Sequence, residues 1–190
     1  MEIAIDYKSY LVKIFEDYTY TENSTDNKYI YMKVIRFDES PYIVSRHAIH
    51  VLEDNEMLGS AILLGAGGGT TIHERCYIIE NDRVYICAGN SLCCLDLPKL
   101  NIIWKVKVDD ATAFEIFKMN NDFIVHGELS VSRINENGKI IWQNYGSDIF
   151  VLQSGKKCVN INENNTISVR SWDNRKYIFD FNGNILSEEN

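Results

Sequence analysis

A glycine run at residues 65–69 (Gly-Ala-Gly-Gly-Gly), followed by two threonines, is the first cluster with the residue types for chemistry. Such glycines can bring backbone N–H groups close to a phosphate, provided that a helix follows. The next residues, TIHERCYII, favour a strand instead, and no Gly-Lys-Ser/Thr is present. We therefore interpret the run as a flexible connection between elements.

His47 and His50, with Glu53 nearby, have the residue types of a metal site. Side chains three residues apart share a face on a helix, but on a strand they point to opposite faces. A strand is expected here, so the two histidines cannot bind one ion together. The same alternation separates His73 from Glu74, and we expect no metal site.

The five cysteines are an odd number without regular spacing. This is not typical of a secreted disulfide framework, and the N-terminus lacks the features of a signal peptide. No run is long enough to span a membrane. We expect a cytoplasmic protein with reduced thiols. Cys93 and Cys94 are adjacent in an expected strand, which should turn one thiol to the core and the other outward.

Paired carboxylates occur at Asp109-Asp110, in an expected loop, and at Glu188-Glu189, in the terminal segment. Neither pair has the flanking pocket that glycosidase chemistry requires. GxSxG and HExxH motifs are absent from the sequence. The residues therefore predict no catalytic residue, no cofactor and no metal.

The elements that position these side chains should be strands. Ile, Val, Thr and the aromatic residues make up 65 of the 190 residues, whereas alanine occurs 7 times. β-branched and aromatic side chains fit a pleated sheet better than a helix. We expect one all-β domain over residues 1–190, with a divergent hairpin region at 1–60 and repeats at 61–190.

Residues 81–106 and 120–144 repeat one order of elements: strand, glycine turn, strand, tight turn, and a strand that ends in tryptophan. The two tryptophans, Trp104 and Trp142, lie 38 residues apart. A weaker copy covers 165–188, and a degenerate copy ends within 48–63. Units of this size match propeller blades, which must stack to bury both faces. We predict about four to five three- or four-stranded antiparallel blades, in a closed ring or an open arc.

The strings SLCCLDLPKLNIIWKV and SVSRINENGKIIWQN resemble the repeat of quinoprotein-type (PQQ-repeat) β-propellers. The first copy carries the resemblance on its residues 95, 96 and 102–104, and the second on 134, 135 and 138–142. The resemblance implies blade architecture and a Trp that docks between neighbouring blades. The chain is too short for the eight-bladed enzymes of that family, and no residues for a quinone or its metal are evident. Only the fold is therefore inferred from it.

Two local features complete the prediction. Asn137-Gly138 and Asn182-Gly183 indicate hairpins with type I′ turns. Residues 6–18 have apolar spacing that fits either a helix or a strand, and we favour a long hairpin with an expected strand at 28–37. Tyrosines that alternate in this region could form an exposed stripe, namely Tyr18, Tyr20, Tyr29 and Tyr31.

A net charge of −8 argues against a nucleic-acid partner. Residues 1–60 carry 11 acids and 6 bases, a net charge of −5, which suits a basic protein partner. The leading hypothesis is a non-catalytic protein-interaction module, such as a bacterial toxin-neutralising (immunity-type) protein. One alternative is a small-molecule binder or enzyme that uses the central opening, with His73, Arg75 or the glycine run at its mouth. Another is a scaffold that assembles through sheet edges. The oligomeric state is left open.

Overall fold

The computed structural model describes residues 2–37, 39–152 and 157–189. These residues form seventeen β-strands in four sheets, here called A to D in chain order. The all-β prediction is confirmed, and the number of sheets agrees with the predicted four to five blades. No helix that is long and apolar enough to cross a membrane occurs in the described residues.

Sheet A has the strand order β1-β2-β4-β5-β3, with β1 (Glu2–Tyr7), β2 (Tyr10–Glu16), β3 (Lys33–Arg36), β4 (Ser45–Glu53) and β5 (Glu56–Gly65). Sheet B contains β6 (Tyr77–Glu80), β7 (Arg83–Ala88), β8 (Ser91–Asp96) and β9 (Ile102–Lys107). Sheet C contains β10 (Ala113–Met119), β11 (Asp122–Gly127), β12 (Ser130–Ile134) and β13 (Ile140–Tyr145). Sheet D contains β14 (Val159–Ile161), β15 (Ile167–Arg170), β16 (Lys176–Phe179) and β17 (Ile185–Glu189). Sheets B to D are antiparallel meanders.

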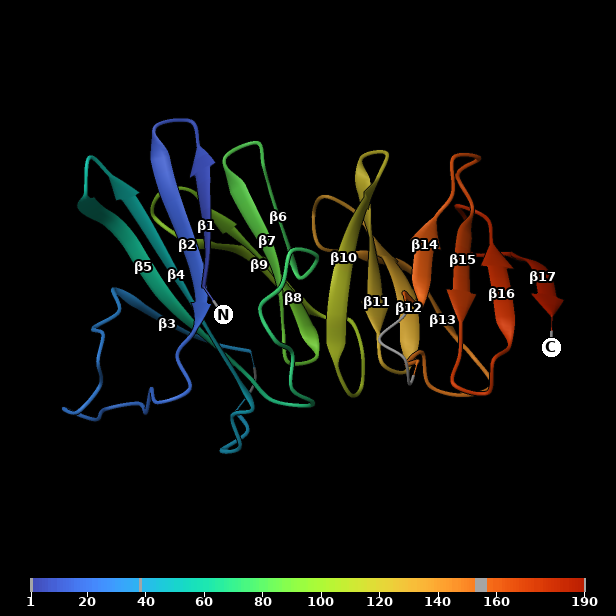
Figure 1. Cartoon of the computed structure of the whole chain (residues 1–190), viewed down its shortest axis with the longest axis horizontal. Helices are drawn as coiled ribbons and strands as arrows, with labels where there is room; N and C mark the ends of the chain where they lie inside the picture. The colour runs from blue at the N-terminus through green and yellow to red at the C-terminus, as the bar shows by residue number, and fades with distance from the viewer. Residues whose placement is uncertain (1, 38, 153–156, 190) are drawn as a thin grey trace.

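The four sheets stand side by side in a row, with sheet A at one end and sheet D at the other (Figure 1). Each neighbouring pair buries a separate apolar cluster, as when Ile49 of sheet A packs with Ile86 of sheet B. Phe123 belongs to the cluster between sheets B and C, and Phe179 to the one between C and D. Within the described ranges no strand pairing links sheets A and D. Of the two predicted arrangements, the structure has the open row.

The repeated tryptophans dock each blade on the next one. Trp104 of sheet B donates its indole N–H to the Glu136 carbonyl of sheet C (2.9 Å), and a Cβ on Gly138 would lie 2.5 Å from the ring. Trp142 of sheet C repeats this arrangement on sheet D, with Gly183 under its ring. A glycine is needed in each turn because the ring covers the place of a side chain. The docking role that the resemblance implied for these two residues is therefore present.

The turns that hold these glycines differ from the predicted type. Gly138 and Gly183 have positive φ, whereas the asparagines before them do not, and a bulge lies in each hairpin. This is the pattern of a type I turn followed by a left-handed glycine, so the type I′ prediction was wrong at both sites. A two-residue turn with positive φ at both positions occurs instead at Asp54 and Asn55, between β4 and β5.

The N-terminal region forms strands, but with other partners than predicted. β1 and β2 pair with each other as a short hairpin, and β2 continues against β4. Of the expected strand at 28–37, only β3 is regular, and it runs parallel to β5 at the far edge of sheet A. The predicted hairpin between residues 6–18 and 28–37 is therefore wrong. Apolar alternation identified both strands but could not identify their neighbours.

The outer faces of sheets A and D, at the two ends of the row, carry different kinds of side chain. On sheet A, Tyr20 and Tyr31 are buried in one cluster with Phe15, and Tyr29 packs against it, whereas Tyr18 is 64% exposed. Three of the four tyrosines therefore cover the sheet, and the predicted exposed stripe is not formed. Sheet D instead turns polar side chains outward, such as Ser168, whose hydroxyl accepts a hydrogen bond from Asn162 (2.8 Å). A polar outer face needs no further sheet to cover it.

All five cysteines are buried, and Cys93 and Cys94 lie on the two faces of sheet B. Cys93 belongs to the cluster shared with sheet A, and Cys94 to the cluster shared with sheet C. The prediction that one of them points outward was wrong, because a sheet between two neighbours has no outward face. Burial raises the pKa of Cys93 to about 12 and that of Cys94 to about 11. Both behave as small apolar residues.

Candidate functional site

The glycine run lies where sheets A, B and C meet. A Cβ on Gly65 would be 2.8 Å from the Gly89 nitrogen, and one on Gly68 would be 1.8 Å from the Thr112 hydroxyl. Gly65 ends β5 and the rest of the run leads to β6, so the predicted connection between sheets is confirmed, and its backbone packs closely against its neighbours. The glycines are explained by this close approach.

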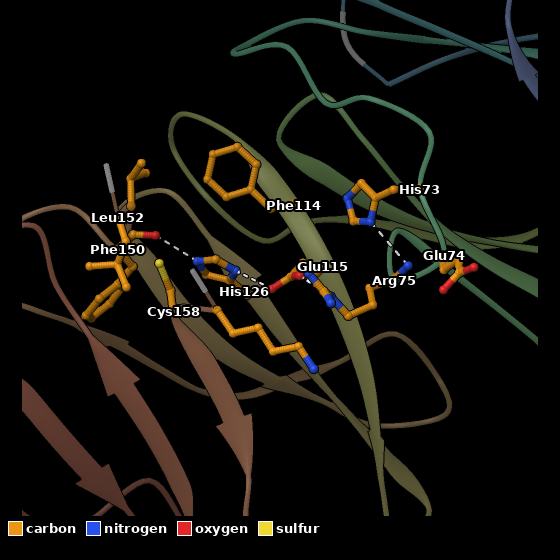
Figure 2. A pocket seen from close by; sticks show the side chains of 11 residues that line it. His73, Glu74, Arg75, Phe114, Glu115, His126, Phe150, Leu152 and Cys158 are labelled. Carbon is orange, nitrogen blue, oxygen red and sulfur yellow. Dashed lines mark hydrogen bonds and ion pairs between the residues drawn. The ribbon is translucent and has the colours of Figure 1, made fainter. Parts of the chain in front are cut away.

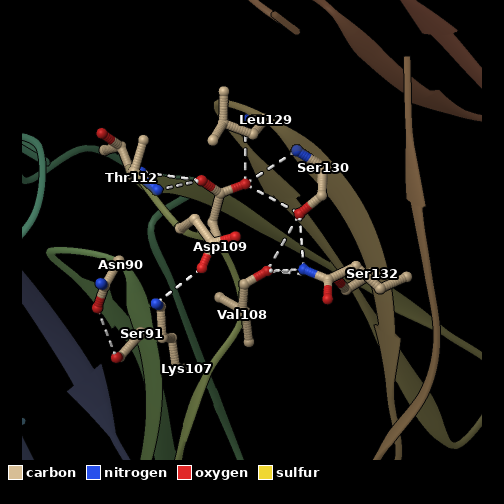
Figure 3. Close-up of polar contacts among 12 residues, drawn as sticks. Asn90, Ser91, Lys107, Val108, Asp109, Thr112, Leu129, Ser130 and Ser132 are labelled. Carbon is tan, nitrogen blue, oxygen red and sulfur yellow. Dashed lines mark hydrogen bonds and ion pairs between the residues drawn. The ribbon is translucent and has the colours of Figure 1, made fainter.

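Asp109 and Asp110, the carboxylate pair in the loop between β9 and β10, have different environments (Figure 3). Asp109 is buried and its Oδ2 accepts hydrogen bonds from the backbone N–H groups of Leu129 (3.0 Å) and Ser130 (2.9 Å), while Oδ1 accepts from the Thr112 N–H (3.1 Å). Asp110 is exposed and pairs with Lys107. The buried carboxylate therefore ties sheet B to sheet C, and neither aspartate lines the pocket described below.

His47 and His50 point to opposite faces of sheet A, as predicted. His47 is fully buried between sheets A and B, with Nε2 2.8 Å from the Thr70 carbonyl oxygen and Nδ1 3.1 Å from that of Cys87. Burial lowers its pKa. A neutral ring can donate to only one of these two carbonyls. His50 packs against aromatic rings on the outer face, and no group of metal-ligating side chains occurs in the described residues.

A pocket of about 530 Å³ opens between sheets B, C and D (Figure 2). We call it the junction pocket. Its walls come from residues 73–75 before β6, 114–115 at the start of β10, His126 near the end of β11, and 150–152 and 157–158 before β14. Each wall is thus an end of a strand or a connection between sheets. Its volume lies within the range of ligand pockets.

His126 and Glu115 form the buried floor of the junction pocket. The Glu115 carboxylate accepts a hydrogen bond from His126 Nδ1 (2.9 Å), and the Phe150 carbonyl accepts one from Nε2 (2.8 Å). Because one of the two acceptors is a carboxylate, it compensates a positive ring, and the ring donates from both nitrogens as an imidazolium. Burial alone would lower its pKa, but hydrogen bonds to Cys158, Glu115 and Phe150 outweigh burial and raise the pKa to about 9.

Arg75 approaches the same carboxylate from the pocket side, with its Nε donating to Glu115 Oε1. Burial would raise the pKa of Glu115, but the bonds from His126 and Arg75 outweigh this effect and lower it. The carboxylate is therefore ionised and shared by two cations. The Arg75 side chain remains 44% exposed, in contrast to the 8% of Glu115.

His73 lies beside Arg75 and accepts a hydrogen bond from its backbone N–H at Nδ1 (3.2 Å). Burial lowers its pKa, so the ring is neutral near pH 7. In chemical terms, the junction pocket offers fixed cations and apolar walls. His126 has both ring nitrogens engaged, so it has no free position from which to accept a proton.

The sequence analysis named His73, Arg75 and the glycine run as candidates for the mouth of a central opening. In the structure, His73 and Arg75 line the junction pocket, whereas the glycine run does not. Sequence reasoning missed Glu115 and His126, which supply the buried charges. Both are polar residues inside apolar strand segments, AFEIF and FIVHG, and this was the available signal.

No protein-family model and no curated protein matches the chain. Among solved structures, it is similar to BamB from Moraxella catarrhalis, with a TM-score of 0.52 and 15% identity over 78% of this chain and 44% of that one. It is also similar to the computationally designed Ika8 protein, with a TM-score of 0.52 and 8% identity over 80% of this chain and 47% of that one. The chain thus spans less than half of each.

Both of these structures are β-propellers, and the BamB structure is of the PQQ-like kind. The chain therefore has a β-propeller-like all-β fold. A likeness at this level of identity concerns the fold, and the function has to be argued from the junction pocket itself.

Proposed function

We propose that the chain is a non-catalytic protein-interaction module, located in the cytoplasm, that receives a partner protein in the junction pocket. The observation that carries the proposal is the pocket of about 530 Å³, because half-buried apolar side chains surround a rigid charged floor. Phe114 and Leu152 supply apolar contact area. Such a combination suits a side chain that anchors a protein partner.

The fixed floor supports binding more than catalysis. A general base needs a free nitrogen or oxygen within reach of substrate. The His126 ring is bonded on both sides, and Glu115 is neutralised by two cations. These bonds also keep the pocket in one shape, which lowers the entropic cost of binding.

A small-molecule binder is the second candidate function. It is supported by His73 and Arg75, two of the side chains named for that hypothesis, although they line the junction pocket and not the central opening of a ring. The finer assignment of the repeats to the quinoprotein type is likewise a proposal, supported by the docking of Trp104 and Trp142 on the turn glycines of the next blade.

Site-specific photocrosslinking tests the leading proposal. The crosslinker p-benzoylphenylalanine is placed at Phe114 in the pocket or, as a matched control, at Tyr145 on the opposite edge of sheet C. In cells of the source, we expect one protein to crosslink through position 114 and not through position 145. An excess of purified wild-type chain should compete with this product, whereas a Phe114→Ala chain should not.

Equal crosslinking at both positions, or none at position 114, would overturn the protein-binding proposal. A pocket that binds small molecules from a cell extract while giving no crosslink at position 114 would favour the second candidate. Mass spectrometry of the pocket-bound fraction distinguishes these results.

A further inference from the structure

We propose that the junction pocket selects a ligand with one carboxylate on an apolar body. This inference deepens the proposed function, because it rests on the binding role of the same pocket and names the chemistry recognised there. The chain as a whole is acidic, with a net charge of −8, so a site for an anion is not what its composition suggests.

Three charged side chains meet at the pocket floor. The Glu115 carboxylate contacts two groups, the His126 imidazolium on one side and the Arg75 guanidinium on the other. His126 is held as a cation by the Glu115 carboxylate, which lies 2.9 Å from its Nδ1, while its Nε2 faces the Phe150 carbonyl. Two positive charges and one negative charge leave the floor with one uncompensated positive charge. A partly buried charge of this kind is weakly screened by salt.

The rim does not cancel this excess. Glu74 and Lys157 are both exposed, and their opposite charges balance each other. Glu74 also lies on the far side of Arg75 from the Glu115–His126 pair (Figure 2). An anion that enters the pocket therefore meets a net positive potential.

Arg75 is placed to bind the anion directly. Its Nε is used by Glu115, and among the described contacts its two terminal NH₂ groups have no hydrogen-bond partner. These groups lie in the plane that matches the two oxygens of a carboxylate. The single excess charge fits a singly charged carboxylate better than a doubly charged phosphate ester.

The remaining walls indicate what the carboxylate should be attached to. Phe114 and Leu152 are half-buried and line the pocket, and Phe150 closes it from the core side. These side chains offer contact to an aromatic or branched aliphatic group beside the charge. Such a ligand could be the C-terminal end of a partner protein or a free aromatic acid, which share this chemistry.

The test compares an acid with its neutral amide. The probes are 3-phenylpropionate and 3-phenylpropionamide, titrated into the full wild-type chain and followed by chemical-shift changes in ¹H–¹⁵N spectra. We expect the acid to bind at least tenfold more tightly than the amide, with the largest shifts at the residues around the pocket. The comparison needs no variant, so a folding defect cannot obscure it.

Two variants that each lose one positive charge test whether the preference for the acid over the amide depends on Arg75. Arg75→Gln removes the proposed carboxylate-binding group, and Arg170→Gln removes an exposed arginine from the outer face of sheet D. We expect the acid and the amide to bind R75Q equally, while R170Q keeps the wild-type preference. Equal binding of the two probes to the wild-type chain, or an equal loss in both variants, would overturn the inference.

The peptides acetyl-Ala-Ala-Phe with a free carboxylate and with a C-terminal amide form a second pair of probes. Tighter binding of the peptide acid than of 3-phenylpropionate would assign the pocket to a protein C-terminus, and the reverse order to a free acid. A crosslink at position 114 without any acid preference would remove this inference and leave the protein-binding proposal standing. An acid preference without a crosslink at position 114 would support this inference and overturn the protein-binding proposal.

Discussion

Two buried histidines bridge two different sheet junctions in this molecule. His47 joins sheets A and B and faces two backbone carbonyls, whereas His126 joins sheets C and D and faces one carbonyl and the Glu115 carboxylate. The rings are almost equally buried, with exposed fractions of 0% and 5%. Burial lowers the pKa of His47, while the pKa of His126 is raised to about 9 despite its burial.

Burial alone therefore does not decide the charge of these two histidines: for His126 the interactions with Cys158 and with the Glu115 carboxylate outweigh burial and raise the pKa. A carbonyl dipole cannot compensate the desolvation of a full positive charge, but a carboxylate can. Sheets A and B therefore meet through a neutral contact. Sheets C and D meet through the bond from the charged His126 ring to the Phe150 carbonyl. The ion pair itself lies within sheet C, between Glu115 on β10 and His126 on β11, and lines the junction pocket.

Removing the counter-ion should have the largest effect. Glu115→Gln leaves Arg75 and His126 without their carboxylate, and we expect unfolding to become easier by about 3 kcal/mol in urea denaturation. The control Glu74→Gln changes an exposed carboxylate at the same rim and should cost less than about 0.5 kcal/mol. A loss below about 1 kcal/mol for E115Q would mean that the ion pair does not hold the junction.

The two histidines should change the stability of the fold with pH in opposite directions. The pKa of His126 is raised from 6.5 to about 9 on folding, so its contribution is complete below pH 6.5 and is lost as the pH rises towards 9. This change is about 3 kcal/mol. The pKa of His47 is lowered on folding, so its contribution is present above pH 6.5 and is lost as the pH falls.

Urea titrations from pH 5 to pH 9.5 measure both effects. His126→Gln should flatten the alkaline decline, and His47→Gln should weaken the acid decline, to which His50 and His73 also contribute. An alkaline decline that survives unchanged in H126Q would contradict the assignment of the raised pKa.

Asp109 is a buried anion between sheets B and C that has no histidine partner. Removing its charge should have an intermediate effect on stability. Asp109→Asn replaces one accepting oxygen with a donor that faces N–H groups, so we expect a loss of about 2 kcal/mol. Asp110→Asn is the neighbouring control, and its exposed pair with Lys107 should be worth less than about 1 kcal/mol. Equal losses in the two variants would show that burial of Asp109 does not matter.

His47→Gln should have the smallest effect on stability at pH 7.5. Its amide can still donate to one carbonyl, so the expected loss is about 1 kcal/mol by urea denaturation. His126→Gln should cost more at the same pH, because it leaves Glu115 with Arg75 alone. The reverse order would break the comparison between the two junctions.

The repeated features of the fold could be predicted from the sequence because they depend on local patterns. Strand alternation and the Trp104–Trp142 spacing identified the blades, and the glycines of the turns were recognised although the turn type was not. The pairing of β3 with β5 was missed, because apolar alternation says which face is buried but not which strand lies alongside.

The junction pocket was only partly predictable for a physical reason. His73 and Arg75 were singled out in the sequence, but their partner Glu115 lies 40 residues beyond Arg75, and the Phe150 carbonyl comes from the connection to the next sheet. Such contacts arise from the stacking of sheets and leave no local spacing in the sequence. The immunity-type role stays a prediction.

The protonation state of His126 is the central claim, and long-range ¹H–¹⁵N spectra of the four histidines test it most directly. Each ring is assigned with its His→Gln variant and titrated from pH 5 to pH 10. We predict that at pH 7.5 His126 carries protons on both nitrogens, with a midpoint near 9, while His47, His50 and His73 are neutral. A neutral His126 ring at pH 7.5 would contradict both the ion pair with Glu115 and the positive pocket floor.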